Sequence, residues 1–483
     1  MTTIKNIKNS KIRLFPLQTK DHGFILYNDL PSSYLLSFLI DKCNFNINQF
    51  KIEYVYLFKN YVKDLFNKLD NFEEEYFIFS LENYFHSSEY WYNFLVKVLD
   101  KLKENKQKSK ILIHSIKTSN IKARKIMQNY DFIEFFISTD LEYFFYELFV
   151  KKTDVENISN VIYRNNNWEI IENEITNVDY DLNDYIIGAY YNRYYTNFPK
   201  SKDYILSIID EPKKINNNIY YLQSKEKYRK LLLSQDDRKI MLSTWRGCKY
   251  NCSYCYRGVK YKKVRQISLE TIKKDLDYLE EVWYRYIYFY DDCFITTNLD
   301  RIDEIIELLW NYSFSYWIAA RYEVCSNNIL EKLSKINISR IQIWLQSISK
   351  LSNIESKRWF DIKWFSEVME NFKKKNIKVT LDLILGLPWE WVKDFLKTFE
   401  YAIKLKPTSI YINRLFLNPK TELDNNKQKY WIITSGDLWQ EKLFHVPNIV
   451  ESNTFSKKDI VFAQKYVSYY IKKYENILPI ILR

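Results

Sequence analysis

The second half of this chain alternates short apolar segments with longer amphipathic ones, and this alternation constrains the fold more than any other feature. Six apolar segments are predicted to be strands, at residues 239–244, 285–290, 316–320, 340–345, 378–385 and 409–415. Helical periodicity separates most of them, for example at 363–374 and 390–405. Strands that alternate with helices form parallel sheets. The sequence therefore predicts an α/β chain in which residues 236–417 form a partial (β/α)6 TIM barrel.

Polar side chains occur at the carboxyl ends of these predicted strands. In barrels of parallel strands, catalytic and ligand-binding groups gather at that end. The polar residues at or near the strand ends are Asp291, Asp292, Arg321, Gln346, Ser347 and Asp382. Strands with a purely structural role would not need this coincidence, so the sequence predicts a site at this end of the barrel.

A loop with three cysteines follows the first strand of the predicted barrel. Cys248, Cys252 and Cys255 are spaced as C-x3-C-x2-C. Thiolates at this spacing can bind one face of a four-iron cluster. Three protein ligands leave the fourth iron free to bind a small molecule, so the loop indicates chemistry as well as electron storage.

Other uses of these thiols fit the sequence less well. Structural zinc takes four protein ligands, and catalytic zinc takes three plus water. No histidine lies near the loop, and the chain has no second CxxC pair. Disulfides belong to oxidising compartments, and the N-terminus lacks the apolar stretch of a signal peptide. We therefore expect a cytoplasmic protein with reduced cysteines, and an oxygen-sensitive cluster favours anaerobic conditions.

The cysteine loop resembles the signature of the radical S-adenosylmethionine (radical SAM) superfamily. That signature reads CxxxCxΦC, where Φ is an aromatic residue and here is Tyr254. The resemblance implies a [4Fe-4S] cluster on the three cysteines, with S-adenosylmethionine (SAM) chelated to the free iron. It also implies reductive cleavage of SAM to a 5′-deoxyadenosyl radical that abstracts a hydrogen atom. The electron would come from a donor of the flavodoxin or ferredoxin type.

Residues after the second and fourth strands match SAM-binding positions of that family. Asp291–Asp292 falls where the family accepts hydrogen bonds from the SAM amino group, a role that suits carboxylates. Gln346 and Ser347 match the end of a GxQS motif that contacts SAM. Arg358 matches an arginine that pairs with the SAM carboxylate, which a guanidinium binds through two parallel hydrogen bonds.

The fifth strand resembles the family's DLIxGLP segment. In that segment the acid, here Asp382, contacts SAM, and the isoleucine, here Ile384, packs on the adenine. Arg321 is expected to reach the ribose or the substrate. Cys325 has two interpretations. Free cysteines are mostly small buried residues, whereas peptide epimerases of the superfamily use a cysteine to return a hydrogen atom to the substrate radical.

The first 150 residues also alternate strands with helices. Predicted strands at 11–16, 76–81, 110–115 and 132–137 indicate an open parallel, Rossmann-like sheet. Their order resembles the cobalamin-binding domain that precedes many radical SAM domains. Where that family has Gly-Gly the chain has His114–Ser115, and the lower-ligand motif DxHxxG is absent. Side chains block the close backbone approach that glycine permits, which leaves the fold expected and cobalamin binding in doubt.

The remaining segments are a bridge at 151–235, with a predicted hairpin at 161–171, and a short helical tail at 418–483. Residues 454–459 of the tail read TFSKKD. They resemble a TFS-x-x-D segment of radical SAM proteins that modify ribosomally made peptides. No cysteine follows Cys325, which excludes a cysteine-rich extension for auxiliary clusters.

The composition of the chain bears on which kinds of molecule it is expected to bind. A net charge of +12 would suit nucleic acid, but the surplus of Lys and Asn is typical of an AT-rich genome. No RNA-binding module is recognisable, so nucleic acid is disfavoured. Hydrophobic residues make up 47% of the chain, as in globular proteins. No uninterrupted apolar run reaches the length of about 18 residues that a membrane span needs.

The first functional hypothesis is modification of a ribosomally made peptide. The reaction would be methylation if cobalamin binds and epimerisation if it does not. The second hypothesis is a radical SAM enzyme that acts on tRNA or a small metabolite. The third is a catalytically inactive module that binds a peptide or partner, which the intact cysteine loop disfavours.

Overall fold

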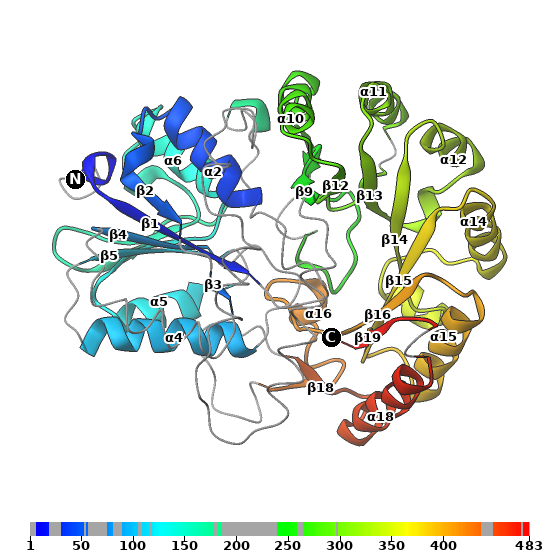
Figure 1. Cartoon of the computed structure of the whole chain (residues 1–483). Coiled ribbons are helices and arrows are strands. Elements are labelled where there is room, and N and C mark those ends of the chain that lie inside the picture. Colours follow the sequence, from blue (N-terminus) through cyan, green and yellow to red (C-terminus); the bar gives the residue numbers. More distant parts are fainter. Residues whose placement is uncertain are drawn as a thin grey trace, which may run out of the picture. The chain divides into compact units, whose positions relative to one another are not determined.

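The computed structural model describes residues 6–18, 30–52, 55–56, 75–80, 89–104, 109–115, 118, 120–176, 181–184, 239–257, 264–295, 298–435, 448–474 and 477–482. These residues fall into two compact units, each built on its own large sheet (Figure 1). The first unit carries the N-terminal sheet, and the second carries the cysteine loop and the predicted barrel strands.

An eight-stranded sheet forms the first unit. Five strands run parallel, in the order β2 (Phe50–Ile52), β1 (Ile12–Gln18), β4 (Tyr76–Ser80), β5 (Lys110–His114) and β6 (Ile133–Ile137). The short strand β3 (Val55–Tyr56) also pairs with β1. The antiparallel strands β7 (Val161–Arg164) and β8 (Ile170–Glu172) complete the sheet.

Helices cover both faces of this sheet. In Figure 1, α4 (Glu89–Glu104) and α5 (Asn120–Asn129) lie on one face, and α2 (Leu30–Asp41) and α6 (Leu141–Phe149) lie on the other. Every residue of β4 and β6 is buried. Strands covered on both sides are continuous apolar runs, which is why their sequences were recognisable. The predicted open parallel α/β sheet is confirmed.

The hairpin predicted at 161–171 is β7 and β8, and it lies at the edge of this first sheet. Its turn is closed by Asn165 and Glu169, whose backbone N–H and C=O are 3.0 Å apart. The described start of the segment 151–235 therefore continues the N-terminal sheet. The domain boundaries themselves stay predictions, and residues 185–238 lie outside the described residues.

A seven-stranded sheet belongs to the second unit, except for its residues 239–241. Its order is β9 (Lys239–Leu242), β12 (Tyr286–Phe289), β13 (Ser315–Ala320), β14 (Ile338–Gln346), β15 (Lys378–Leu385), β16 (Ser409–Arg414) and β19 (Ile480–Leu482). Pairing from β12 through β19 is parallel. The first six strands coincide with the predicted ones and confirm the partial barrel. The seventh corrects the expectation of a purely helical tail.

Six helices lie outside this curved sheet (Figure 1): α10 (Leu269–Glu281), α11 (Leu299–Trp310), α12 (Asn327–Leu333), α14 (Ile362–Lys374), α15 (Val392–Lys404) and α18 (Lys457–Lys473). Strand β14 shows how the two faces differ. Ile343 and Leu345 are buried, whereas Gln342, Trp344 and Gln346 are half-buried. Because side chains alternate along a strand, the apolar set faces the helices and the half-buried set lines the inner face.

The TFS-x-x-D segment of the tail starts helix α18. Ser456 Oγ accepts a hydrogen bond from Asp459 N at 3.2 Å, and Ser456 N donates to Asp459 Oδ2 at 2.9 Å. This reciprocal pair is a capping box, which satisfies N–H groups that a helix start leaves open. Phe455, just before it, is buried. Helix initiation and packing therefore account for this segment without a substrate.

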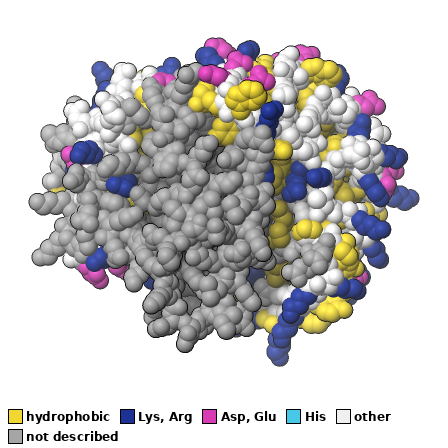
Figure 2. All heavy atoms as spheres, viewed as in Figure 1, with side chains coloured by type: hydrophobic (Ala, Val, Ile, Leu, Met, Phe, Trp, Pro, Cys, Tyr) yellow, Lys and Arg dark blue, Asp and Glu magenta, His cyan; other side chains and the backbone are white. Residues whose placement is uncertain are grey.

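None of the described helices is both long and apolar enough to cross a membrane. Figure 2 shows Lys and Arg side chains spread over the visible face of the described residues, among apolar and uncharged side chains. On that face the positive charge is therefore distributed and does not form one basic patch.

Candidate functional site

The three cysteines lie on a loop that begins after β10 (Trp245–Arg246), a short strand paired with β11 (Arg265–Gln266). All three thiols are free and half-buried. Gly247, which precedes Cys248, has a φ of 106°, a conformation that other side chains rarely adopt. Glycine here lets the chain turn from the strand into the loop.

Other segments of the second unit hold this loop in place. Leu423 N donates to the carbonyl of Ser253 at 2.9 Å, and the amide of Asn418 donates to the carbonyl of Tyr254 at 3.1 Å. The Ser253 hydroxyl donates to the carbonyl of Glu355 at 2.8 Å. The loop is therefore anchored by segments that follow β14 and β16.

The cysteine thiols must lose their protons before they can bind iron. Burial raises the pKa of Cys248 and of Cys255 to about 11, so cluster binding must displace their protons. Within the part of the chain that the structure describes, no three His, Cys, Asp or Glu side chains are close enough to hold one metal ion. The ligands of a four-iron cluster bind different irons and lie farther apart than the ligands of one ion.

Asp291 braces the strand that leads to the loop. Its Oδ1 accepts from Thr244 N at 2.8 Å and from Trp245 N at 3.1 Å, and its Oδ2 accepts from the Thr244 hydroxyl at 2.9 Å. Burial raises the pKa of Asp291 to about 7, although these hydrogen bonds oppose the shift. Both carboxylate oxygens therefore already have protein donors.

Asp292 braces both ends of the loop itself. Its carboxylate accepts from Gly247 N at 3.0 Å and forms a buried ion pair with Arg257, two residues beyond Cys255. Arg257 is a residue that sequence analysis missed. The SAM contact predicted for Asp291–Asp292 stays a prediction, since their observed bonds are all to this loop and its strand.

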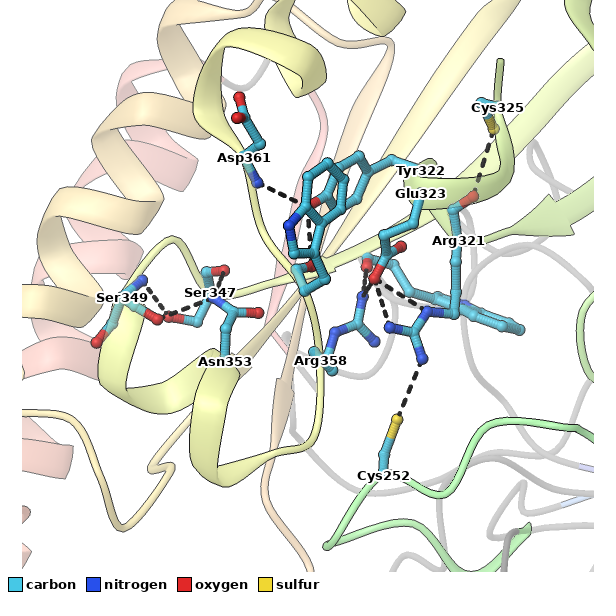
Figure 3. Close-up of polar contacts among 12 residues, drawn as sticks. Cys252, Arg321, Tyr322, Glu323, Cys325, Ser347, Ser349, Asn353, Arg358 and Asp361 are labelled. Atoms are coloured by element: carbon cyan, nitrogen blue, oxygen red, sulfur yellow. Dashed lines mark hydrogen bonds and ion pairs between the residues drawn. The ribbon is translucent and has the colours of Figure 1, made fainter.

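Two buried arginines share the carboxylate of Glu323 (Figure 3). Arg321 Nε donates to Glu323 Oε1 at 3.1 Å, and Arg358 Nη2 lies 3.8 Å from the same oxygen. Arg358 also donates to the carbonyl of Trp344 at 2.5 Å. Arg321 Nη1 donates to the sulfur of Cys252 at 3.6 Å. The fold thus brings both predicted arginines to the cysteine loop, around a glutamate that sequence analysis missed.

Strand β14 ends in an unusual backbone conformation. Gln346 has a φ of 65°, which few non-glycine residues adopt, and the register with β15 shifts at this point. The Ser347 hydroxyl donates to the carboxylate of Glu390 and accepts from Ser349 N at 2.9 Å. The SAM contacts predicted for Gln346 and Ser347 stay predictions.

Asp382 and Ile384 lie on β15. Asp382 is buried and accepts a hydrogen bond from Gln342 on the neighbouring strand. Ile384 belongs to a buried apolar cluster with Tyr254 and Trp389, against which Cys252 and Cys255 pack. The structure therefore places Ile384 and Tyr254 together beside the cysteines, while the adenine contact stays a prediction.

Cys293 and Cys325 are buried near this site. The Cys325 thiol donates to the carbonyl of Arg321 at 3.4 Å, and the Cys293 thiol donates to the carbonyl of Ile295 at 3.1 Å. Figure 3 shows Cys325 beside the backbone of Arg321, at the opposite end of that residue from Cys252. These contacts suit buried structural cysteines, and the hydrogen-donor role of Cys325 stays a prediction.

Four of the buried polar atoms that lack protein partners within the described part of the chain belong to residues that end or follow strands of the second unit. Among the described residues, Gln346 Oε1, Glu323 Oε2, Arg358 Nε and Asn413 Oδ1 are buried and have no hydrogen-bond partner. Buried polar groups are nearly always satisfied. These four follow or end β13, β14 and β16, and they include a donor and several acceptors. Such a set fits SAM, which carries both an ammonium and a carboxylate.

Sequence analysis missed Glu323 and Asn413 for a physical reason. Asn413 lies beside Ile384 only because β15 and β16 pair in that register, which no local pattern reveals. Glu323 had a weak signal, because it follows Arg321 by two residues and opposite charges at that spacing can pair. Two opposite charges at this spacing could equally form an ion pair on the surface, so the pattern did not identify Glu323 as a site residue.

Side chains fill the described strand ends of the first unit, where cobalamin binding was in doubt from the sequence. Ser80, at the end of β4, bonds to His114 Nδ1 at 3.0 Å, and the hydroxyls of Ser115 and Thr118 are 2.8 Å apart. Both pairs are buried. His114 and Ser115 stand where the cobalamin-binding family has glycines, at the end of the sheet where ligands bind.

Glu390 is expected to make the protein less stable as the pH rises from about 5 to about 8. Burial raises its pKa to about 8, compared with about 4.3 in an unfolded chain. The folded state therefore keeps a proton that the unfolded state releases. Its stabilising effect is complete below about pH 4 and is lost as the pH rises through 8. At about 1.4 kcal/mol per pH unit, the loss between about pH 5 and 8 approaches about 4 kcal/mol.

Urea unfolding of wild type and Glu390→Gln near those two pH values measures this effect. The amide does not ionise, so the variant should lose much less stability on going to the higher pH. Glu370→Gln, at an exposed position on α14, should behave like wild type. Equal losses in Glu390→Gln and wild type would contradict the expectation.

Residues 242–402 match the radical SAM superfamily. An uncharacterized protein of Methanocaldococcus jannaschii, MJ0486, is 26% identical over 247 residues, which are 47% of this chain and 74% of that protein. The oxygen-independent coproporphyrinogen-III oxidase-like protein HemZ of Bacillus subtilis is 28% identical over 167 residues, 33% of this chain and 30% of HemZ.

Two solved structures resemble nearly the whole chain. The cobalamin-dependent SAM radical enzyme OxsB, with aqua-cobalamin and SAM bound, superposes with a TM-score of 0.61 at 14% identity and covers 98% of this chain and 68% of OxsB. The radical SAM methyltransferase TsrM from Kitasatospora setae, with tryptophan and a SAM analog bound, superposes with a TM-score of 0.63 at 12% identity. The likeness covers 97% of this chain and 91% of TsrM. At these identities the likeness shows the fold. Together with the cysteine loop, the family match shows that residues 242–402 form a radical SAM domain.

Proposed function

We propose that Cys248, Cys252 and Cys255 bind a [4Fe-4S] cluster and that SAM binds beside it, at the carboxyl ends of β13 to β16. The observation that carries this proposal is the set of three free thiols on one anchored loop, next to buried polar atoms that lack protein partners. When bound, the cluster and SAM supply a 5′-deoxyadenosyl radical that abstracts a hydrogen atom from the substrate.

The chain's own residues bind and orient SAM in this proposal. Arg358 pairs with the SAM carboxylate, for which its Nε is the buried donor that lacks a partner among the described residues. Gln346 and Asn413 offer carbonyl oxygens to the ammonium and ribose. Ile384 packs on the adenine, since it already lies in the apolar cluster beside the loop.

The proposed substrate is a ribosomally made peptide. Leu351, Ile354 and Trp359, which flank Arg358, are 54%, 60% and 56% exposed. In this proposal a bound peptide extends over these apolar side chains, which a small metabolite would not reach. An electron donor of the flavodoxin or ferredoxin type would reduce the cluster, because radical SAM enzymes need one.

The filled strand ends of the first unit favour a reaction without cobalamin, such as epimerisation. The fold likeness to OxsB and TsrM supports the second candidate, cobalamin-dependent methylation. Cobalamin absorbance of the reconstituted protein distinguishes the two.

The test is 5′-deoxyadenosine formation by anaerobically reconstituted, reduced protein. We expect SAM cleavage that increases when a peptide encoded beside the gene is added, and not when tRNA is added. Protein that holds four irons yet forms no 5′-deoxyadenosine under either condition would refute the proposal. Stimulation by RNA that weakens with salt would favour the tRNA hypothesis instead.

A further inference from the structure

We propose that Arg321 raises the reduction potential of the cluster by donating a hydrogen bond to the sulfur of Cys252. Glu323 and Tyr250 are the positioning residues that hold its guanidinium. This inference rests on the proposed function, because it requires a cluster on the cysteine loop.

Three different contacts fix the guanidinium of Arg321. Its Nε and Nη2 both donate to Glu323 Oε1, the first at 3.1 Å. Its central carbon lies 3.9 Å from the ring centroid of Tyr250. With one edge bound to Glu323 and one face on the ring, Nη1 is directed at the sulfur of Cys252, 3.6 Å away (Figure 3).

The site around this group is buried and charged. The Arg321 side chain is 4% exposed and that of Glu323 is 11% exposed. Glu323 also lies 3.8 Å from Arg358, and the Lys249 ammonium is 4.9 Å from the centroid of the same Tyr250 ring. Burial keeps water from screening these charges. The Arg321–Cys252 contact therefore acts in a medium where a hydrogen bond to a charged group is strong.

Hydrogen bonds to cluster sulfurs are a known control of reduction potential. Reduction adds one negative charge to the cluster and its thiolates. A donor on one of those thiolates stabilises the reduced form more than the oxidised form. Removing the donor should therefore make the cluster harder to reduce.

The geometry also distinguishes Arg321 from Arg358. Every nitrogen of the Arg321 guanidinium donates to Glu323 or Cys252. In contrast, Arg358 has a buried Nε that lacks a partner in the described parts of the chain. Arg358 therefore suits an added ligand, whereas Arg321 is committed to the cysteine loop.

The experiment is a potentiometric titration of the reconstituted cluster, followed by electron paramagnetic resonance. Arg321→Lys keeps the positive charge but cannot make all three contacts, because an ammonium lacks the planar fork. We expect the ratio of reduced to oxidised cluster at a fixed potential to fall at least tenfold, a shift of about 59 mV for one electron. Arg301→Lys replaces another buried arginine of this unit, paired with Glu304 at 3.2 Å, and should leave the potential unchanged.

Tyr250 provides a second pair of variants that leaves Arg321 in place. Tyr250→Leu should shift the potential in the same direction, and Tyr250→Phe, which keeps the ring face, should match wild type. These variants decide the question if Arg321→Lys loses its iron. A wild-type potential in Arg321→Lys or in Tyr250→Leu, with iron retained, overturns this inference alone. Wild-type protein without a four-iron cluster overturns the proposed function and this inference together.

Discussion

Replacing Cys252 with alanine is expected to abolish cluster binding and reduce 5′-deoxyadenosine formation to the background of iron-free protein. Cys252 is the central thiol of the loop, so the change leaves two ligands that cannot span one face of a four-iron cluster. It also removes the sulfur that Arg321 contacts at 3.6 Å. Iron and sulfide content, visible absorbance and product analysis after anaerobic reconstitution measure the effect.

Two other cysteines serve as controls for this variant. Cys43 lies in the first unit, where burial raises its pKa to about 12, and Cys43→Ala should keep its iron. Cys325→Ala should also keep its iron, because its thiol bonds to a backbone carbonyl. Full turnover by Cys325→Ala would remove the hydrogen-donor hypothesis. Wild-type iron and product in Cys252→Ala would contradict the cluster assignment.

Replacing Asp292 with alanine is expected to destabilise the second unit and release the cluster. The change leaves the Arg257 guanidinium without its buried partner and removes the acceptor for Gly247 N. Breaking a buried ion pair by removing one partner costs about 3–5 kcal/mol. Because these two bonds hold both ends of the cysteine loop, iron content should fall together with the free energy of unfolding.

Asp303→Ala provides the matched control for Asp292→Ala. Asp303 pairs with Lys332 at 2.6 Å, but the two side chains are 44% and 21% exposed. Exposed pairs contribute about 0–1 kcal/mol, so this variant should unfold in urea nearly as wild type does and should keep its iron. If Asp292→Ala were as stable and as iron-rich as Asp303→Ala, the bracing role of Asp292 would be wrong.

Strands such as β4, β6 and β15 were predictable because they are buried on two faces. Segments such as 76–79 and 383–385 are apolar along their length, and each is followed by an amphipathic helix or a polar end. Strand β19 was missed because it is only Ile480–Leu482 and pairs with β16 from far along the chain. Pairing across such a distance leaves no local periodicity.

The candidate site was predictable only where a residue acts through its own chemistry. Thiols at fixed spacing and an arginine near a strand end carry that signal in the sequence. The bracing roles of Asp291 and Asp292 carry no such signal, because their partners are backbone N–H groups at Thr244, Trp245 and Gly247. Every residue except proline has a backbone N–H group, so only the tertiary structure decides which of these groups lies beside each carboxylate.

By itself, the sequence determined the alternation of strands and helices, the placement of polar side chains at strand ends, and the thiol spacing. These depend on the order of residues along a few turns or one strand. Only the tertiary structure decided that Glu323 joins two arginines, that Arg321 faces Cys252, and that His114 bonds to Ser80. Each of these contacts depends on the register between strands and on the path of the loops after them, and a change of one residue in register would direct the side chain to the opposite face.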